Sequence, residues 1–182
     1  NVAARLVQSV AADAARALAS VPTADVAMVT LAVPQSSWPK HLTPLSGYLV
    51  PKPQQRLVTA TSFGSQKWKH WAVPGSVLLR ISLGRDGLPV LHLSDEQLLA
   101  AAVDDVSHHI GVDLQPTHWR VTRWPGAFPQ YRPHHAGLVA DVERRLPQGV
   151  VLAGASYHGI GIPACIHSAQ RAAAAVGRPT PP

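Results

Sequence analysis

The sequence predicts an α+β or mixed α/β fold: a mixed, largely antiparallel sheet with helices, followed by a separate terminal strand–helix unit. Three observations support this. Short apolar, β-branched runs separated by turn signals lie between residues 25 and 83. A helical pattern with its own start and stop signals occupies 94–111. A lone apolar run at 149–154 precedes a glycine-rich turn and a last helical pattern.

The first expected element is an Ala-rich amphipathic helix over residues 2–20. Pro22 ends this pattern, because proline lacks the amide that a continuing helix needs. Apolar residues recur at helical spacing, so we expect a buried stripe made of Leu6, Val10, Ala14 and Leu18.

Four strands are expected next, because each of these runs is short, apolar and rich in β-branched residues. They are residues 25–33, 47–50, 57–62 and 77–83. Turn signals mark their ends, among them the "RDG" at 85–87. We expect these strands to form one antiparallel or mixed sheet.

The clearest helix begins after Ser94. Ser94 and Gln97 have the spacing of a capping box, and acidic residues fill the first turn, where the helix dipole favours them. Gly111 fits the C-terminal stop. The expected buried stripe of this helix is Leu99, Val103, Val106 and Ile110.

The last third of the chain is expected to contain a strand from Thr117, a proline-rich crossing, a helix over 138–146 and a buried strand over 149–154. The last helix is expected over 163–176, with 177–182 as a frayed end.

Charge and composition narrow the function classes. The net charge is +6 and the pI about 10.1, and "SQKWKHW" at 65–71 mixes basic and aromatic residues as single-strand binders do. However, the basic residues are spread along the chain and no recognition motif accompanies them. We therefore expect anionic small molecules rather than nucleic acid as partners. No run reaches the roughly 18 apolar residues of a membrane span.

The histidines and the cysteine give little indication of a metal site or a catalytic site. The pairs His108–His109 and His134–His135 lack ligand spacing, so no metal site is expected. His158, beside the glycine turn, is either a polar contact or a general base, and the polar contact is favoured. Cys165 is expected to be a small buried apolar residue.

The glycine turn, "GIGIP" at 159–163, leaves two interpretations open. No capping side chain directly precedes the last helix, so its first amides need another acceptor. Gly159 and Gly161 would let a bulky group approach the backbone, which favours an anion or dipole site at the helix N-terminus. A tight packing turn capped by water explains the same residues equally well.

Two long segments resemble a known family: "HWRVTRWPGAFPQY" and "VVLAGASYHGIGIPACIHSAQRAA". They are similar to the C-terminal end of the flavin-dependent porphyrinogen oxidases, within the flavin amine oxidase superfamily. That family includes protoporphyrinogen oxidase and its coproporphyrinogen-oxidising relatives. "LSGYLVP", "TATSFGSQKW" and "VLLRISLG" extend the resemblance over most of the chain.

The resemblance implies FAD as cofactor, bound on a two-domain scaffold. Residues 1–22 would lead into the substrate domain, 23–133 would form part of it, and 134–182 would be the C-terminal part of the FAD-binding domain. By this resemblance Trp124 and the stretch Gly159, Ile160, Gly161 and Ile162 contact the flavin. It assigns no catalytic residue within the chain, and no metal.

The implied activity is oxidation of coproporphyrinogen III or protoporphyrinogen IX to the porphyrin, in haem biosynthesis. Hydrides pass to the flavin in three rounds, and dioxygen reoxidises it to give hydrogen peroxide. The implied partners are the porphyrinogen, dioxygen and the N-terminal FAD-binding part of the same protein. The implied location is the cytoplasm, with peripheral membrane contact through a missing region left open.

Some features depart from the family pattern. The chain contains no GxGxxG, so the nucleotide half of the FAD site is expected elsewhere and this chain alone is expected to be inactive. Ala164 stands where relatives often have Asp, and Pro133 and His134 follow where they often have Gly–His. Two alternatives stay open: another flavin oxidase or desaturase, or a non-enzymatic module that binds an anionic ligand.

Overall fold

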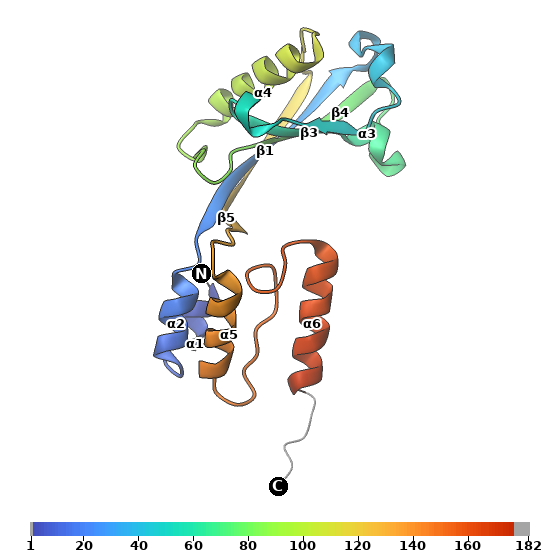
Figure 1. Ribbon diagram of the computed structural model, residues 1–182. Coiled ribbons are helices and arrows are strands. Elements are labelled where there is room, and N and C mark those ends of the chain that lie inside the picture. The colour runs from blue at the N-terminus through green and yellow to red at the C-terminus, as the bar shows by residue number, and fades with distance from the viewer. Residues whose placement is uncertain (1, 177–182) are drawn as a thin grey trace. The chain divides into compact units, whose positions relative to one another are not determined.

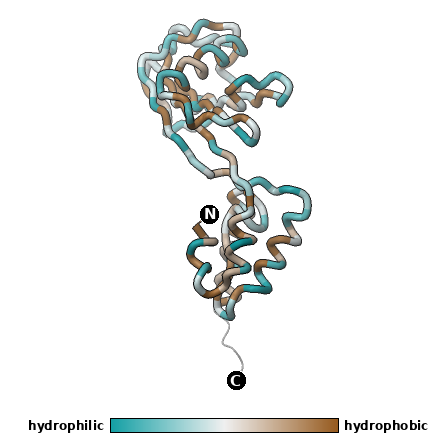
Figure 2. The backbone as a smooth tube through the Cα atoms, turned by 90° about the vertical axis from the view of Figure 1, so that its left-hand side faces the viewer, coloured by the Kyte–Doolittle hydropathy of each residue, from teal (hydrophilic) through white to brown (hydrophobic). Residues whose placement is uncertain are grey.

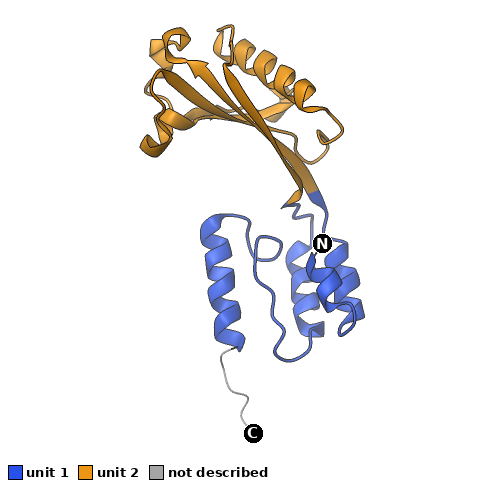
Figure 3. Ribbon diagram, turned by 180° about the vertical axis from the view of Figure 1, so that it is seen from behind, with its two compact units in different colours: residues 1–23, 128–182 blue, residues 24–127 orange. Residues whose placement is uncertain are grey.

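The computed structural model describes residues 2–176 of the 182-residue chain, and the expected frayed end at 177–182 lies outside them. The chain forms two compact units (Figures 1 and 3). Unit 2 is residues 24–127, and unit 1 combines 1–23 with 128–182. The functional division at 22/23 and 133/134 stays a prediction.

Unit 2 is built on a five-stranded sheet in the order β2-β3-β4-β1-β5. Its strands are β1 (Thr23–Pro34), β2 (Gly47–Leu49), β3 (Val58–Phe63), β4 (Ser76–Leu83) and β5 (His118–Pro129). The pairs β1–β4, β2–β3 and β3–β4 are antiparallel, with a bulge between Val58 and Ala60. The five expected strands of this part are confirmed, and in β1 and β4 buried apolar side chains alternate with less buried residues as expected for strands with one covered face.

Helix α4 (Asp95–Ile110) covers one face of this sheet (Figure 1). The predicted capping box is confirmed: Ser94 Oγ accepts from the Gln97 amide and the Gln97 side chain accepts from the Ser94 amide. Gly111 ends the helix at φ 68°, in the left-handed region.

The expected buried stripe of α4 is mostly wrong in phase. Among its apolar residues Leu98, Ala102 and Val106 are buried, whereas Leu99, Val103 and Ile110 are only partly covered. The side of α4 that packs on the sheet includes Leu98 and Ala102, each one position before Leu99 and Val103 of the expected stripe. Both sets have helical spacing, so periodicity alone could not choose between them.

Short helical turns connect the strands: η1 (Gln35–Ser37), η2 (Lys40–Leu42), η3 (Lys52–Gln54), α3 (Gly64–Lys67) and η4 (Lys69–Trp71). Trp38 and Phe63 meet edge to face at 4.9 Å in the core. Trp68 and Trp71, from the basic and aromatic stretch at 65–71, pack on each other at 4.8 Å between ring centroids.

Unit 1 contains the helices α1 (Val2–Val7), α2 (Ala12–Ala19), α5 (His135–Arg145) and α6 (Ile162–Val176). The single helix expected over 2–20 is wrong, because a turn at 8–11 divides it. The amides of Val10 and Ala11 both donate to the Val7 carbonyl there. The turn changes the buried side, so Leu6 and Val10 are exposed while Ala4 and Val7 are buried.

The helices α1, α2 and α5 enclose a second small core. Its buried members are Ala4, Val7, Ala14, Ala15, Leu18, Val139, Val142 and Tyr157. Arg145 on α5 also approaches Asp13 on α2 at 3.7 Å. Figure 2 shows apolar and polar residues alternating along the elements of both units, as expected for elements with one buried side.

The strand expected over 149–154 is not formed. Residues 151–153 have no regular secondary structure, and Val150 and Val151 are partly exposed. A strand exists only when a neighbouring strand satisfies its amides and carbonyls, and no strand of unit 1 pairs with this segment among the described residues. The helix expected after it is confirmed as α6.

None of the helices within residues 2–176 combines the length and the apolar character that crossing a bilayer would require.

Candidate functional site

The glycine loop, residues 153–161, is held by Tyr131, just before α5, and by His135, the first residue of α5. The Tyr131 hydroxyl donates to the Ala155 carbonyl at 2.7 Å and accepts from the Gly159 amide at 2.8 Å. The His135 ring stacks on Tyr131 at 3.9 Å, and its Nε2 lies 3.1 Å from the Ser156 carbonyl oxygen. Tyr131 and His135 therefore hold the middle of the loop, at residues 155, 156 and 159.

Three further contacts complete this support. The Gly154 amide donates to the buried Ser168 hydroxyl of α6 at 3.2 Å. Tyr157 inserts into the unit 1 core, where burial raises the pKa of its hydroxyl. His158 Nε2 lies 2.8 Å from Glu143 on α5, and the role of His158 toward a cofactor stays a prediction.

Contacts within the described chain are sufficient to explain why residue 159 is a glycine. Its φ is +122°, which L-residues rarely adopt, and a Cβ there would lie 2.7 Å from the Ala164 Cβ. Gly159 thus lets the loop close against the first turn of α6. For this residue the packing interpretation is sufficient.

Gly161 is different, because nothing in the described chain requires a glycine there. Its φ lies outside the left-handed region, and the nearest atom to an added Cβ would be Pro163 Cδ at 3.9 Å. That is ordinary van der Waals contact, so a methyl group fits. If position 161 needs to be small, the reason must lie outside these residues.

The start of α6 presents partly unsatisfied amides, as expected. The Cys165 amide is an exception, since it donates to the Gly161 carbonyl at 2.9 Å. Within residues 2–176 the amides of Ile162 and Ala164 have no acceptor. Ile160 and Ile162 beside them are exposed, Ile162 to 78%. A bound group at this helix end would therefore find two donors and an apolar wall.

Cys165 is only partly buried, which corrects the expectation of a buried residue. Its thiol lies 3.6 Å from the Ile160 carbonyl. This contact ties the first turn of α6 back to the loop.

Trp124 belongs to unit 2, on the edge strand β5, while the glycine loop belongs to unit 1. Its side chain is 50% exposed, so it is not a core aromatic of its unit. An exposed tryptophan without a core role is available to contact a ligand.

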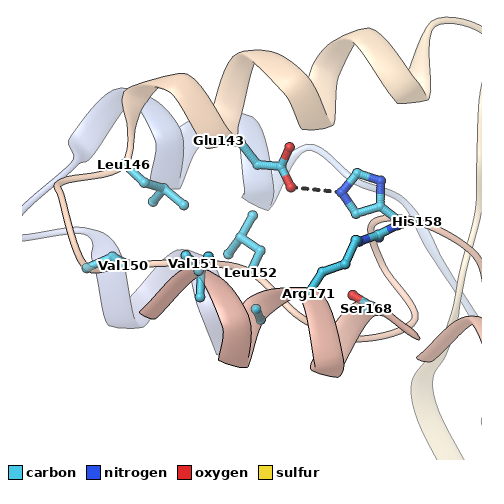
Figure 4. Close-up of a pocket in the computed structure, with 10 residues that line it drawn as sticks. Glu143, Leu146, Val150, Val151, Leu152, His158, Ser168 and Arg171 are labelled. Atoms are coloured by element: carbon cyan, nitrogen blue, oxygen red, sulfur yellow. Dashed lines mark hydrogen bonds and ion pairs between the residues drawn. The ribbon is translucent and has the colours of Figure 1, made fainter. Parts of the chain in front are cut away.

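A cavity of about 210 Å³ lies in unit 1 between α5, the segment 150–152 and α6 (Figure 4). Leu146, Val150 and Leu152 provide apolar walls, and Glu143, His158 and Arg171 provide polar ones. Neither Trp124 nor any residue of 159–162 lines this cavity. It adjoins the segment that was expected to be a strand.

Sequence reasoning missed Tyr131 and His135 as supports of the loop. The "PQY" motif was noted, but only the tertiary structure shows that its hydroxyl bridges residues 155 and 159. Among residues 2–176 no three His, Cys, Asp or Glu side chains gather into a group that could hold a metal ion.

Comparison with protein families gives a match over nearly the whole chain. The model of the flavin containing amine oxidoreductases matches residues 1–177. Coproporphyrinogen III oxidase of Mycobacterium tuberculosis is 41% identical over 175 residues, which are 95% of this chain and 37% of that protein. Protoporphyrinogen oxidase of Bos taurus is 28% identical over 188 residues, covering 97% of this chain and 38% of that protein.

A solved structure is similar as well. It is a putative protoporphyrinogen oxidase from Exiguobacterium sp. 255-15, with a TM-score of 0.77 and 29% identity over 92% of this chain and 38% of that one. The chain thus spans just over a third of the length of these proteins.

Proposed function

Because the chain belongs to the family of flavin-containing amine oxidoreductases, we propose that it is the C-terminal portion of an FAD-dependent porphyrinogen oxidase of haem biosynthesis. The substrate is coproporphyrinogen III or protoporphyrinogen IX, dioxygen is the electron acceptor and hydrogen peroxide the second product. The 41% identity to a coproporphyrinogen III oxidase over 95% of the chain is the observation that carries this proposal.

Two features of unit 1 support the proposal that further protein covers part of this unit in the complete enzyme. The segment 150–153 is rich in apolar residues but has no regular secondary structure and no strand partner among the described residues. Among the residues of α6 only Ser168 is buried, while Ile162, Ile166 and Val176 are each more than half exposed. Apolar residues at these positions would be covered by the remaining, N-terminal part of an FAD-binding domain.

The residues at the start of α6 fit a flavin. When bound, FAD supplies the hydride acceptance on which this oxidation depends. The chain would supply room for close approach at Gly161, the free amides of Ile162 and Ala164, and the positive end of the α6 dipole. These groups stabilise negative charge at the edge of the ring that faces them, which favours the reduced state. The chain would thus position and tune the cofactor.

The function is tested with the complete protein that contains this chain. We expect it to purify with FAD and to oxidise coproporphyrinogen III or protoporphyrinogen IX to the fluorescent porphyrin, with one hydrogen peroxide per hydride removed. Residues 1–182 alone should neither retain FAD nor show activity. A complete protein that holds FAD but oxidises only an amine or a carotenoid-type alkene would contradict the proposal.

Trp124 should contribute to flavin binding in that protein. We expect Trp124→Ala to weaken FAD binding roughly 2- to 13-fold, since an aromatic contact contributes about 0.5–1.5 kcal/mol. Unfolding should change little, because the side chain is half exposed. Trp71→Ala is the control, since Trp71 packs on Trp68 within unit 2. Equal FAD affinities for the two variants, measured by fluorescence titration of the apoprotein, would leave Trp124 without a cofactor role.

A further inference from the structure

The sheet of unit 2 has a second face, turned away from α4. Side chains alternate along each strand, so the residues between the buried ones lie on this face. The strand registers align them in rows, one of which crosses three strands as Ser62, Arg80 and Thr30. The neighbouring row is Ala60, Ser82 and Met28. None of these six residues belongs to the buried core.

Arg80 stands in the middle of its row and is exposed. Its partners on the two neighbouring strands are the small residues Ser62 and Thr30, so the Arg80 guanidinium extends beyond the side chains beside it. Arg80 makes no hydrogen bond or ion pair with any residue of 2–176.

Arg120 on β5 lies on the same face. Val121 packs against the core, and Arg123 binds Asp95 and the Leu93 carbonyl at the start of α4, so both point to the α4 side. Alternation then directs Arg120 to the opposite side of the strand. It also has no hydrogen bond or ion pair among the described residues.

The other three arginines of unit 2 are all engaged within the unit. Arg56 binds Asp104, Arg85 binds Gln55, and Arg123 binds Asp95. The strands carry one acidic residue, Asp25, and its carboxylate accepts from the Gly126 amide. The two unpaired arginines therefore share a face that has positive charge and small side chains around Arg80.

We infer that this face binds the propionate carboxylates of the substrate, with Arg80 and Arg120 as the recognising residues. The inference rests on the proposed function. Arginine presents its donors as a planar fork that matches a carboxylate, and the small residues around Arg80 leave room for a flat macrocycle. Coproporphyrinogen III has four propionates and protoporphyrinogen IX two, so the arginines favour the former when all else is equal.

The test uses the complete enzyme with Arg80→Met and Arg120→Met, which remove the charge and keep much of the side-chain length. A charge-assisted hydrogen bond lost from each should raise the KM for coproporphyrinogen III about tenfold or more. The kcat and the FAD content should change little. The rise should be smaller for protoporphyrinogen IX, and Arg80→Lys should recover part of the loss because it retains the charge.

Arg56→Met is the matched control, because Arg56 is an exposed arginine of the same unit that binds acidic residues of α4. An unchanged KM in both arginine variants, or an equal rise in the Arg56→Met control, would overturn the inference while the oxidase activity itself stood.

A measurement of porphyrin binding tests this inference separately from the proposed oxidase activity, because it needs no turnover. Coproporphyrin III should quench the tryptophan fluorescence of the complete protein more weakly in the Arg80→Met variant, and its tetramethyl ester should bind both proteins alike. If the wild type oxidised neither porphyrinogen, the proposed function would fail and this comparison would still decide the role of the face. Equal binding of coproporphyrin III by wild type and variant, or competition by a single-stranded oligonucleotide in place of the porphyrin, would assign the face to another ligand.

Discussion

Gly161→Asp in the complete enzyme is expected to lower both the FAD occupancy and the reduction potential of the flavin that remains bound. Gly161→Ala should lower occupancy only mildly and leave the potential unchanged. Within this chain an added Cβ at 161 meets nothing closer than 3.9 Å, so the methyl group of Gly161→Ala should not disturb the loop. Any loss of flavin in Gly161→Ala must then come from contact with the cofactor, whereas the aspartate can also accept from the Ala164 amide at the start of α6.

The size of each effect follows from its cause. Overpacking against a bound ring costs about 1–3 kcal/mol, which reduces occupancy. The carboxylate of the aspartate adds negative charge beside a ring that becomes more negative on reduction, so the reduced state is destabilised and the potential falls. Spectroelectrochemical titration of the flavin measures this directly.

Gly159→Ala provides the contrast for these variants. It should destabilise the loop in any state of the protein, because its Cβ would collide with the Ala164 Cβ. If Asp and Ala at position 161 gave the same potential, the start of α6 would not face the reducible ring. The loop would then be a packing turn, as the second interpretation holds.

Asp105→Ala is expected to lower the free energy of unfolding by about 2–4 kcal/mol. Asp105 lies on α4 and is 3% exposed. Its Oδ2 accepts from the backbone amides of Leu57 and Val58, at 3.1 and 3.0 Å, at the start of β3. Removing the acceptor leaves two amides unsatisfied, each costing about 1–3 kcal/mol when buried.

Asp104→Ala is the matched control, because Asp104 is the adjacent carboxylate and is exposed. It forms only a surface ion pair with Arg56, which contributes about 0–1 kcal/mol. Asp105→Asn should fall between the two, since its amide oxygen still accepts one bond. Denaturant unfolding followed by tryptophan fluorescence measures all three variants. Equal losses for the alanine variants of Asp104 and Asp105 would show that Asp105 does not tie α4 to β3.

The sequence by itself determined the features that depend on neighbouring residues. The capping box at Ser94 and the left-handed stop at Gly111 need only residues a few positions apart, and both formed as expected. The strands of unit 2 were predictable for the same reason, since alternation and turn signals are local. The family was also recognisable from motifs along the chain, and the comparison confirms it.

Only the tertiary structure decided which side of an element is buried and which elements exist at all. The sheet selected Leu98 rather than Leu99 on α4, and at the N-terminus Val7 rather than Leu6 joins the core that α1, α2 and α5 share. The segment 149–154 has a strand-like sequence, but a strand also needs a neighbour. The two glycines of the loop look alike in sequence. Gly159 is required by its φ of +122° and by a contact with Ala164, whereas an added Cβ at Gly161 meets nothing closer than Pro163 Cδ at 3.9 Å, because the folded path of the loop sets what a side chain would meet.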